Sequence, residues 1–278
     1  MSNSSDKYLV VGNPIAHSRS PDIHTLFAKQ TSQNMQYASR EIPVGHFSEA
    51  IAELRQKGIK GINVTVPFKA DAYDICTRLS DRAKITGSVN TISITTNDYI
   101  GDTTDGRGLI NDLKSNHQVA LENKTILIIG AGGAVAGVVP DFLAIDNVKL
   151  HIANRTVSKA ENLAVRFKSL GNISVSSIEE IPEHKYDVVV NATSASLSNM
   201  TLNLSDSCIN FETVAYDMVY SSEPTPFLKW TNSKGARLNL DGLGMLVEQA
   251  AVSFEIWRGI KPNTTQVIET VRKKLSGK

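Results

Sequence analysis

The sequence predicts an α/β protein built from two α/β domains, the second of which is a Rossmann-type dinucleotide-binding domain. Three observations support this fold class. Short β-rich runs alternate with helical segments along the chain, a glycine-rich loop directly follows one of those runs, and 278 residues correspond to about two domains. Strands that alternate with helices predict parallel pairing with right-handed crossovers.

The charge balance excludes some classes of partner. The chain has 29 Lys and Arg against 28 Asp and Glu, a net charge of +1. This argues against binding to nucleic acid or to an anionic membrane through bulk charge. The longest uncharged stretch, 125–140, is shorter than the ~20 apolar residues of a membrane span and contains four glycines.

The cysteine content and the N-terminal residues predict a cytoplasmic protein. There are two cysteines, Cys76 and Cys208, and we expect both to be reduced thiols. No Cys–Cys or Cys–His spacing predicts a metal site. The apolar run behind the N-terminus is too short for a signal-peptide core. The sequence leaves the oligomeric state open between a monomer and a homodimer.

Local patterns predict the elements of the first half of the chain. Periodicity and β-rich composition predict strands over 8–12, 61–66 and 91–95, and helices over 46–57 and 105–116.

A second alternating series begins at Thr125. It predicts strands over residues 125–129, 148–153, 186–190 and 214–218. It also predicts one long helix over residues 156–169.

The chain ends with two helical runs that have no strand between them. The first covers 243–257, and the second follows Asn263, an expected N-cap. We expect these helices to return to the first domain. The predicted domains are therefore one of residues 1–104 plus 242–278 and another of residues 105–241.

The glycine loop at Gly130–Gly137 predicts a dinucleotide site. It follows a predicted strand and opens a helix. Gly130 permits a tight turn, and Gly132 and Gly133 let the backbone approach a pyrophosphate group. The free N–H groups and the positive dipole of the helix N-terminus favour that anion.

The next predicted strand indicates NADP rather than NAD. NAD-binding units usually carry an acidic residue at this strand end, which binds the ribose 2′-hydroxyl. Here the strand ends in Asn154-Arg155-Thr156, without an acid to repel a 2′-phosphate. Arg155 can stack on adenine and pair with that phosphate. Lys159 adds a positive charge one helical turn later.

A serine-rich motif lies near the N-terminus. Ser18 and Ser20 precede a predicted helix start at Pro21, where hydroxyl and N–H groups suit an anionic carboxylate; the same pattern is compatible with plain helix caps. His17 and His24 have no partner at metal-ligand spacing, so we expect them to pack or to cap.

Lys69 and Asp105 are candidate catalytic residues. Lys69 stands just past a strand–proline break, where open α/β sheets bind ligands, and a lysine can act as general acid or base. Asp105 stands at a predicted helix start, from which it can orient Lys69. Taken alone, Lys69 is also compatible with a solvated lysine at a helix start, and Asp105 with an ordinary N-cap.

Together these motifs resemble the shikimate dehydrogenase family. The matching segments follow the family's order across nearly the whole chain: GNPIAHSRSP from Gly12, NVTVPFK from Asn63, VNT from Val89, GDTTDG from Gly101, GAGGA from Gly130, NRT from Asn154, NATS from Asn191, YDMVY from Tyr216, TPFL from Thr225 and DGLGMLVEQA from Asp241.

The resemblance implies reversible NADPH-dependent reduction of 3-dehydroshikimate to shikimate in aromatic biosynthesis. It implies that Lys69 is the catalytic lysine and Asp105 its partner. It implies that residues 1–104 plus 242–278 form a substrate-binding domain and residues 105–241 an NADP-binding domain, with a cleft between them. It also implies a set of binding residues. For the substrate they are Ser18, Ser20, Thr65, Asn90, Asp105, Tyr220 and Gln249, and for the cofactor Asp81, Gly130, Ala131, Gly132, Gly133, Ala134, Asn154, Arg155, Thr156, Lys159, Met218 and Gly242.

The sequence departs from the family pattern at three places. Thr103 replaces an asparagine near Asp105, Ala136 replaces an arginine after the glycine loop, and Ala195-Ser196 replaces serine-glycine. The alternatives are a quinate/shikimate dehydrogenase, a paralogue acting on an amino-substituted analogue, or a module that senses NADP without turnover. The presence of both Lys69 and Asp105 argues against the sensor.

Overall fold

The computed structural model describes residues 5–198 and 200–277, in two compact units. The first unit runs to Gly108 and includes Val247–Val271, and the second consists of Leu109–Leu246 with the residues from Arg272 onward. Residues 1–4, part of the stretch expected to lack a signal peptide, lie outside the described residues. The predicted domain limits after residues 104 and 241 stay a prediction.

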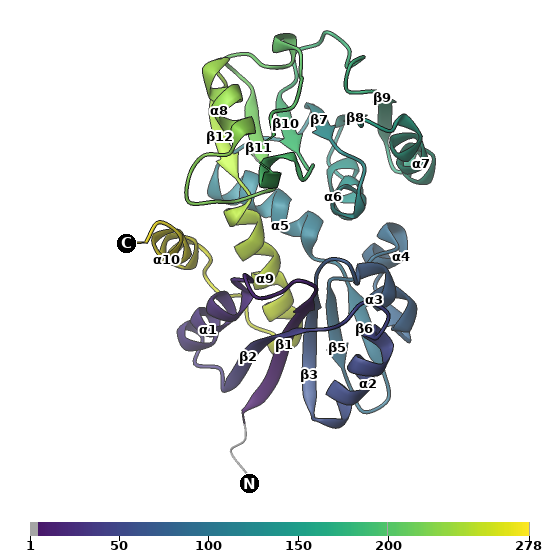
Figure 1. The fold of residues 1–278 in the computed structure, drawn as a ribbon, viewed down its shortest axis with the longest axis vertical. Helices are drawn as coiled ribbons and strands as arrows, with labels where there is room; N and C mark the ends of the chain where they lie inside the picture. The colour runs from purple at the N-terminus through teal and green to yellow at the C-terminus, as the bar shows by residue number, and fades with distance from the viewer. Residues whose placement is uncertain (1–4, 199, 278) are drawn as a thin grey trace. The chain divides into compact units, whose positions relative to one another are not determined.

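The first unit contains a six-stranded mixed sheet (Figure 1). Its strand order is β2-β1-β3-β5-β6-β4. The strands are β1 (Asp6–Gly12), β2 (Met35–Glu41), β3 (Ile59–Val64), β4 (Arg78–Leu79), β5 (Thr91–Ile94) and β6 (Tyr99–Asp102). Parallel pairing throughout, as expected from the alternation, is wrong here. β5 runs antiparallel to both β3 and β6. Between β5 and β6 the turn is too short for the crossover that parallel strands need.

Helices flank this sheet. They are α1 (Ser20–Gln30), α2 (Phe47–Gln56), α3 (Lys69–Ile75), α4 (Asp81–Thr86) and most of α9 (Leu243–Arg258) and α10 (Thr265–Leu275). The last helix begins two residues after the predicted cap, Asn263, whose side-chain oxygen accepts a hydrogen bond from the backbone of Thr265 at 3.0 Å.

The strand directions bring distant parts of the sequence to one edge of this sheet. β1 and β3 are parallel neighbours, so the loops after Gly12 and Val64 leave at the same edge. β5 is antiparallel, so its beginning, next to Asn90, lies there as well. β6 runs back against β5, so its end at Asp102 returns to the same edge. Polar residues just before β5 and just after β1, β3 and β6 can therefore lie close together.

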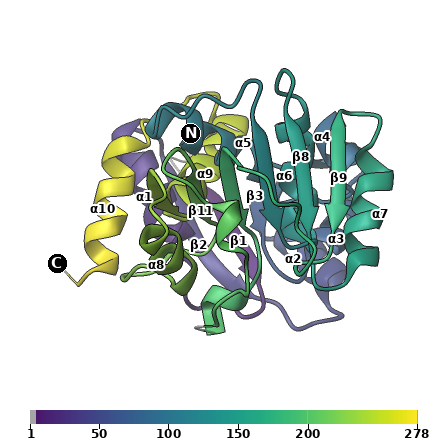
Figure 2. The same ribbon diagram turned by 90° about the horizontal axis from the view of Figure 1, so that it is seen from above.

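The second unit contains a fully parallel sheet of six strands. Its order, β12-β11-β10-β7-β8-β9, is that of a doubly wound dinucleotide-binding fold. The strands are β7 (Thr125–Ile129), β8 (Lys149–Ala153), β9 (Asn172–Ser176), β10 (Val188–Asn191), β11 (Val214–Asp217) and β12 (Leu238–Asp241), and the helices are α6 (Gly133–Leu143), α7 (Val157–Phe167) and α8 (Pro226–Ser233). Figure 2 shows α7 packed beside β9.

Both faces of this sheet are buried, as its central strands predict. In β7, Ile126 and Ile128 belong to one hydrophobic cluster, whereas Leu127 and Ile129 belong to another on the opposite face. Parallel sheets covered by helices on both faces have this pattern. Among the described residues, no helix is long and apolar enough to span a membrane.

The predicted helix over 105–116 is not a uniform α-helix. It consists of α5 (Asp105–Asn111) followed by a π-helical turn, Asp112–Asn116. The turn contains the fully buried Asp112, which accepts hydrogen bonds from Tyr216 Oη at 2.7 Å and Asn116 Nδ2 at 2.8 Å. A β-carbon on Gly244 would collide with this carboxylate, so only glycine fits there.

His24, in α1, packs in the aromatic core of the first unit. Its ring stacks on Tyr37 with centroids 4.0 Å apart and lies 5.6 to 6.2 Å from the rings of Trp257, Phe27 and Phe254. Burial lowers the pKa of His24 to about 3, and the neighbouring Asn63 side chain opposes part of this shift. This histidine is therefore neutral in the folded protein at neutral pH.

His24 predicts a specific loss of stability in acid. In the unfolded chain a histidine has a pKa of about 6.5, so it binds a proton there at a pH at which the folded protein does not. Its contribution to stability is fully present above pH ~6.5 and is lost as the pH falls toward ~3. From pH ~7 to pH ~5 the wild type should lose about 2 kcal/mol that the His24→Leu variant keeps.

Urea unfolding at several pH values, followed by tryptophan fluorescence, measures this difference. An exposed histidine of the same unit, His46, supplies the control variant His46→Leu, which should keep the wild-type pH dependence. Identical pH slopes for the wild type and His24→Leu would contradict the assignment.

Candidate active site

Lys69 and Asp105 form an ion pair at the polar edge of the first sheet. Lys69 Nζ lies 2.5 Å from Asp105 Oδ2, and the two side chains are 22% and 11% exposed. Each is the first residue of its helix: Lys69 opens α3 after the break at Pro67, and Asp105 opens α5. The pair is thus accessible on one side and desolvated on the other, where an ion pair is stronger than at an open surface.

Asn90 holds the second oxygen of Asp105. Its Nδ2 donates to Asp105 Oδ1 at 2.9 Å, while its Oδ1 accepts the backbone N–H of Thr104 at 3.0 Å. A backbone N–H can only donate, so it fixes which end of the Asn90 amide is oxygen. The amide N–H groups must then face Asp105. Both carboxylate oxygens of Asp105 therefore have a donor, Lys69 on one and Asn90 on the other.

Gln249 joins this group from α9. Its side-chain oxygen lies 3.4 Å from Asn90 Nδ2 and 3.3 Å from Thr104 Oγ1. The structure thus brings together four residues that the sequence predicts for the site: Lys69, Asp105, Asn90 and Gln249.

The other predicted substrate residues of the first unit lie at the same edge. The loop after β1 carries Ser18, whose hydroxyl accepts the N–H of Ser20 at 3.3 Å. Ser20 is the first residue of α1, one residue before the predicted start. Thr65 follows β3, and its methyl group lies against Gly12, where a β-carbon would lie 2.5 Å from it.

Four polar residues behind the ion pair were missed by sequence reasoning. Asn63, Thr91, Thr104 and Ser253 are all buried and hydrogen-bonded to Asn90, to Gln249 or to one another. A signal existed for one of them: an asparagine inside the apolar strand run Gly61–Val66 needs a partner. Ser253 gave none, since a serine in a helix is ordinary.

The turn before Asp105 is held by Asp102 rather than by Thr103. The carboxylate of Asp102 accepts hydrogen bonds from Ser80 Oγ at 2.5 Å, from the N–H of Thr103 at 2.8 Å and from Arg107 at 2.8 Å. The buried hydroxyl of Thr103 has no hydrogen-bond partner among the described residues. The side chain that supports Asp105 is therefore Asn90, and the hydroxyl of Thr103 does not take part.

In the second unit the glycine loop has the conformation that phosphate binding requires. Gly130 has a φ of +118°, which favours glycine, and a β-carbon there would lie 3.2 Å from the carbonyl oxygen of Ala192. Gly132 and Gly133 face open space, and Ala131 and Ala134 complete the loop. In the described part of the chain, α6 begins at Gly133 without a side-chain cap, so its first N–H groups are available to an anion.

The loop after β8 has positive charges available for a phosphate. Arg155 and Lys159 are exposed, and neither forms an ion pair with another described residue. Asn154 Nδ2 donates to the carbonyl of Thr156 at 2.8 Å, which shapes the turn that carries Arg155. The residues present fit a dinucleotide that carries an additional phosphate on its adenosine ribose.

The remaining predicted cofactor and substrate residues divide between the units. Met218 and Gly242 meet in the second unit, where a β-carbon on Gly242 would collide with the backbone of Met218. Tyr220 lies in that unit, half-buried. Asp81 lies in the first unit, exposed at the start of α4, and pairs with Lys84 at 3.1 Å.

Two departures from the family pattern fill structural positions. Ala136 is buried in the core of α6. Ser196 is buried too, and its hydroxyl donates to Asp217 Oδ2 at 2.6 Å and accepts from Asn191 at 3.2 Å. Ser196 therefore anchors the loop after β10 to β11.

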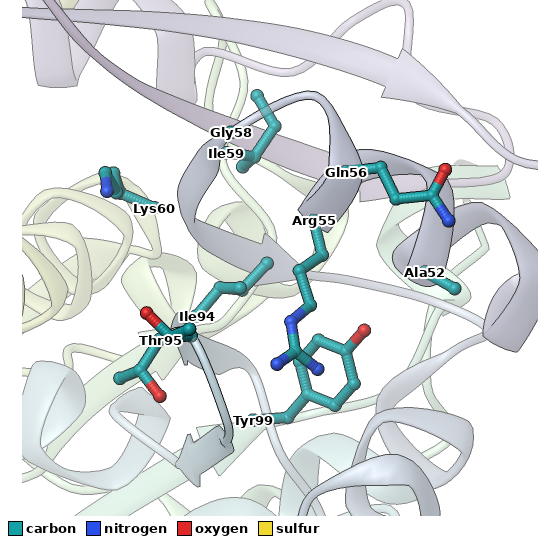
Figure 3. Close-up of a pocket in the computed structure, with 10 residues that line it drawn as sticks. Ala52, Arg55, Gln56, Gly58, Ile59, Lys60, Ile94, Thr95 and Tyr99 are labelled. Carbon is teal, nitrogen blue, oxygen red and sulfur yellow. The ribbon is translucent and has the colours of Figure 1, made fainter.

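A separate pocket lies at the opposite end of the first sheet (Figure 3). It has a volume of about 810 Å³, and Lys60 and Ile94, from the start of β3 and the end of β5, line it. Arg55 lies over the ring of Tyr99, 5.2 Å from its centroid. None of the predicted site residues lines this pocket.

Three family models match the chain. The model described as the shikimate dehydrogenase substrate binding domain matches residues 10–92. That of shikimate / quinate 5-dehydrogenase matches residues 112–210, and that of the shikimate 5′-dehydrogenase C-terminal domain matches residues 242–272.

Curated proteins and solved structures agree with these matches. The shikimate dehydrogenase (NADP(+)) of Photobacterium profundum is 48% identical over 269 residues, 96% of this chain and 98% of that protein. An Ael1 enzyme from Pseudomonas putida has a TM-score of 0.90 at 39% identity, covering 96% of this chain and 98% of that chain. Shikimate 5-dehydrogenase from Thermus thermophilus, in complex with NADP(H) and shikimate, has a TM-score of 0.86 at 29% identity, covering 97% and 100%. The chain belongs to the shikimate dehydrogenase family.

Proposed function

We propose that this protein is an NADP-dependent shikimate dehydrogenase, which reversibly reduces 3-dehydroshikimate to shikimate. The observation that carries the proposal is the Lys69–Asp105 ion pair, held at 2.5 Å at the polar edge of the first sheet. A lysine held by a carboxylate can give a proton to a carbonyl oxygen and take one from a hydroxyl. The family membership makes the ketone of 3-dehydroshikimate the expected acceptor.

In this mechanism the bound NADPH supplies the hydride for the ketone carbon. Lys69 donates its proton to the oxygen, on which negative charge develops, and takes a proton back in the oxidative direction. Asp105 keeps the ammonium group of Lys69 in place. Asn90 keeps Asp105 in place, since its amide donates to the other carboxylate oxygen.

The substrate is held by side chains at the same edge of the sheet. We assign its carboxylate to Ser18 and Ser20, because hydroxyl and N–H groups at the start of α1 suit an anion. We assign its hydroxyl groups and ring to Thr65, Asn90, Asp105 and Gln249, and we assign Tyr220, a residue of the second unit, to the vicinity of the carboxylate. Holding the carboxylate and the hydroxyls together fixes which carbon is reduced.

The cofactor is held by the second unit. We assign its pyrophosphate to the loop Gly130–Ala134 and its 2′-phosphate to Asn154, Arg155, Thr156 and Lys159. Met218 and Gly242 complete the set, with Asp81 as a contact from the first unit. The open glycine loop and the exposed Arg155 support this assignment.

We further propose that the protein acts in the cytoplasm as a monomer or homodimer, on small molecules rather than on nucleic acid. The near-zero net charge supports small molecules, rather than nucleic acid, as its binding partners. Both cysteines, Cys76 and Cys208, are free thiols, which is the state that a reducing compartment maintains.

The test is NADP reduction by the purified protein, measured with shikimate and, in parallel, with quinate and with NAD. NADPH formation with shikimate alone would establish the proposed reaction. Turnover of quinate would indicate a quinate/shikimate dehydrogenase instead. Tight NADP binding without turnover of any substrate would contradict the enzyme and favour the NADP sensor.

Lys69→Ala should remove most of the turnover and leave shikimate binding nearly unchanged. The variant lacks the proton donor, so kcat should fall by about 10²- to 10⁴-fold while the KM for shikimate changes little. Steady-state kinetics at saturating NADP measure both constants. Lys29→Ala, at an exposed lysine of α1, is the matched control and should keep the wild-type kcat. A large rise in KM with kcat intact would remove Lys69 from the chemistry.

Arg155→Gln should weaken NADP and spare NAD. Loss of the charged hydrogen bonds to the 2′-phosphate should raise the KM for NADP by about 10- to 100-fold, because such bonds contribute about 1.5–3 kcal/mol. NAD lacks that phosphate, so its KM should not change. Arg237→Gln, at an exposed arginine of the same unit, is the control. An equal rise in the KM for NADP and in the KM for NAD would contradict the assignment of Arg155 to the 2′-phosphate.

A further inference from the structure

The hydroxyl of Ser253 lies at the centre of the buried polar group behind the ion pair. It lies 3.0 Å from Asn63 Nδ2, 2.8 Å from Thr91 Oγ1 and 3.3 Å from Thr104 Oγ1. It also donates to the backbone carbonyl of Gln249 at 3.1 Å. Ser253 is fully buried, so water cannot replace any of these partners.

These contacts use the full hydrogen-bonding capacity of one hydroxyl. A serine hydroxyl has one proton and two acceptor sites. The Asn63 amide must donate to it, because the same NH₂ group also faces the carbonyl oxygen of Asn90 at 3.2 Å, which can only accept. The proton of Ser253 is then shared between the Gln249 carbonyl and the Thr91 hydroxyl.

Two side chains connect Ser253 to Asp105. Thr91 Oγ1 donates to Asn90 Oδ1 at 2.8 Å, and Asn90 Nδ2 donates to Asp105 Oδ1 at 2.9 Å. A second connection runs through Thr104, whose hydroxyl accepts from Asn90 Nδ2 at 2.9 Å. The N–H of Thr104 fixes which end of the Asn90 amide is oxygen, and the position of that amide depends on neighbours that Ser253 holds.

Ser253 also fixes the position of Gln249. The two residues lie one turn apart on the same face of α9, as positions i and i+4. Ser253 ties that turn of the helix to β3 through Asn63 and to β5 through Thr91. The distance of the Gln249 side chain from Asn90 is set by this attachment.

We infer that Ser253 is a positioning residue for the reaction. Its hydroxyl positions Asn90 against Asp105 through Thr91 and Thr104 and holds Gln249 beside them, and it acts on Lys69 and Asp105 only through these neighbours. This inference rests on the proposed function, in which Lys69 transfers the proton.

The need for a hydroxyl, rather than for a small side chain, follows from burial. Alanine would fit the same space, but in this buried region Asn63 would lose an acceptor and the Thr91 hydroxyl would lose a donor. These groups would move to find other partners, and Asn90 would move with them. Displacements of about 1 Å at a catalytic group can cost ~100-fold in rate.

Ser253→Ala should lower kcat by about 10-fold and raise the KM for shikimate by a few-fold, with the KM for NADP unchanged, because the cofactor binds the second unit. Ser253→Thr keeps the hydroxyl and should recover most of the lost kcat. Val252→Ala is the matched control: Val252 is the buried, apolar neighbour of Ser253 on α9. It should lower the melting temperature and leave kcat unchanged.

A second measurement does not depend on turnover. In ¹⁵N-labelled protein, the side-chain NH₂ resonances of Asn90 should shift in Ser253→Ala and stay in place in Val252→Ala. Wild-type kcat in Ser253→Ala, or an equal loss of kcat in Val252→Ala, would overturn the inference. If the wild type does not oxidise shikimate, the proposed function has failed. Unshifted Asn90 resonances in Ser253→Ala would then overturn the inference separately.

Discussion

Polar side chains that are cut off from water must satisfy one another, and this constraint organises the first unit. Two backbone groups decide the outcome. The N–H of Thr104 orients the amide of Asn90, and the carbonyl of Asn90 orients the amide of Asn63. If either amide rotated by 180°, its NH₂ group would face another donor or its oxygen another acceptor. Buried polar groups would then be left unpaired. Both carboxylate oxygens of Asp105 therefore accept a hydrogen bond, and the ammonium group of Lys69 has a carboxylate partner in a fixed position.

The two sheets place functional groups in different ways. In the parallel sheet of the second unit, only the ends of strands reach the ligand edge, so the glycine loop after β7 and Arg155 after β8 are both strand-end features. In the mixed sheet, the reversal of β5 adds the beginning of a strand to the same edge. Asn90 precedes its strand, whereas Lys69 follows one, and the two still serve one carboxylate.

Sequence reasoning recovered what local chemistry encodes. The glycine loop, the charge of Arg155 and the positions of Lys69 and Asp105 at helix starts follow from residue types next to recognisable strand ends. The antiparallel course of β5 and the π-helical turn after α5 could not be predicted, because both depend on pairing and packing with distant segments. The role of Ser253 was hidden for the same reason: its partner Asn63 lies 190 residues away.

That separation has a consequence for how the chain acquires its structure during synthesis. The first unit is interrupted by the second, so the ribosome releases Asn63 and Asn90 long before Ser253 and Gln249. Until α9 emerges, the residues of this edge lack the partners that Ser253 and Gln249 provide. The strands of the second unit are made in that interval, and domains generally fold as units while the chain grows. The group around Asp105 is thus complete only once α9 has joined it, and a chain truncated before α9 would contain the ion pair and Asn90 without Ser253 and Gln249.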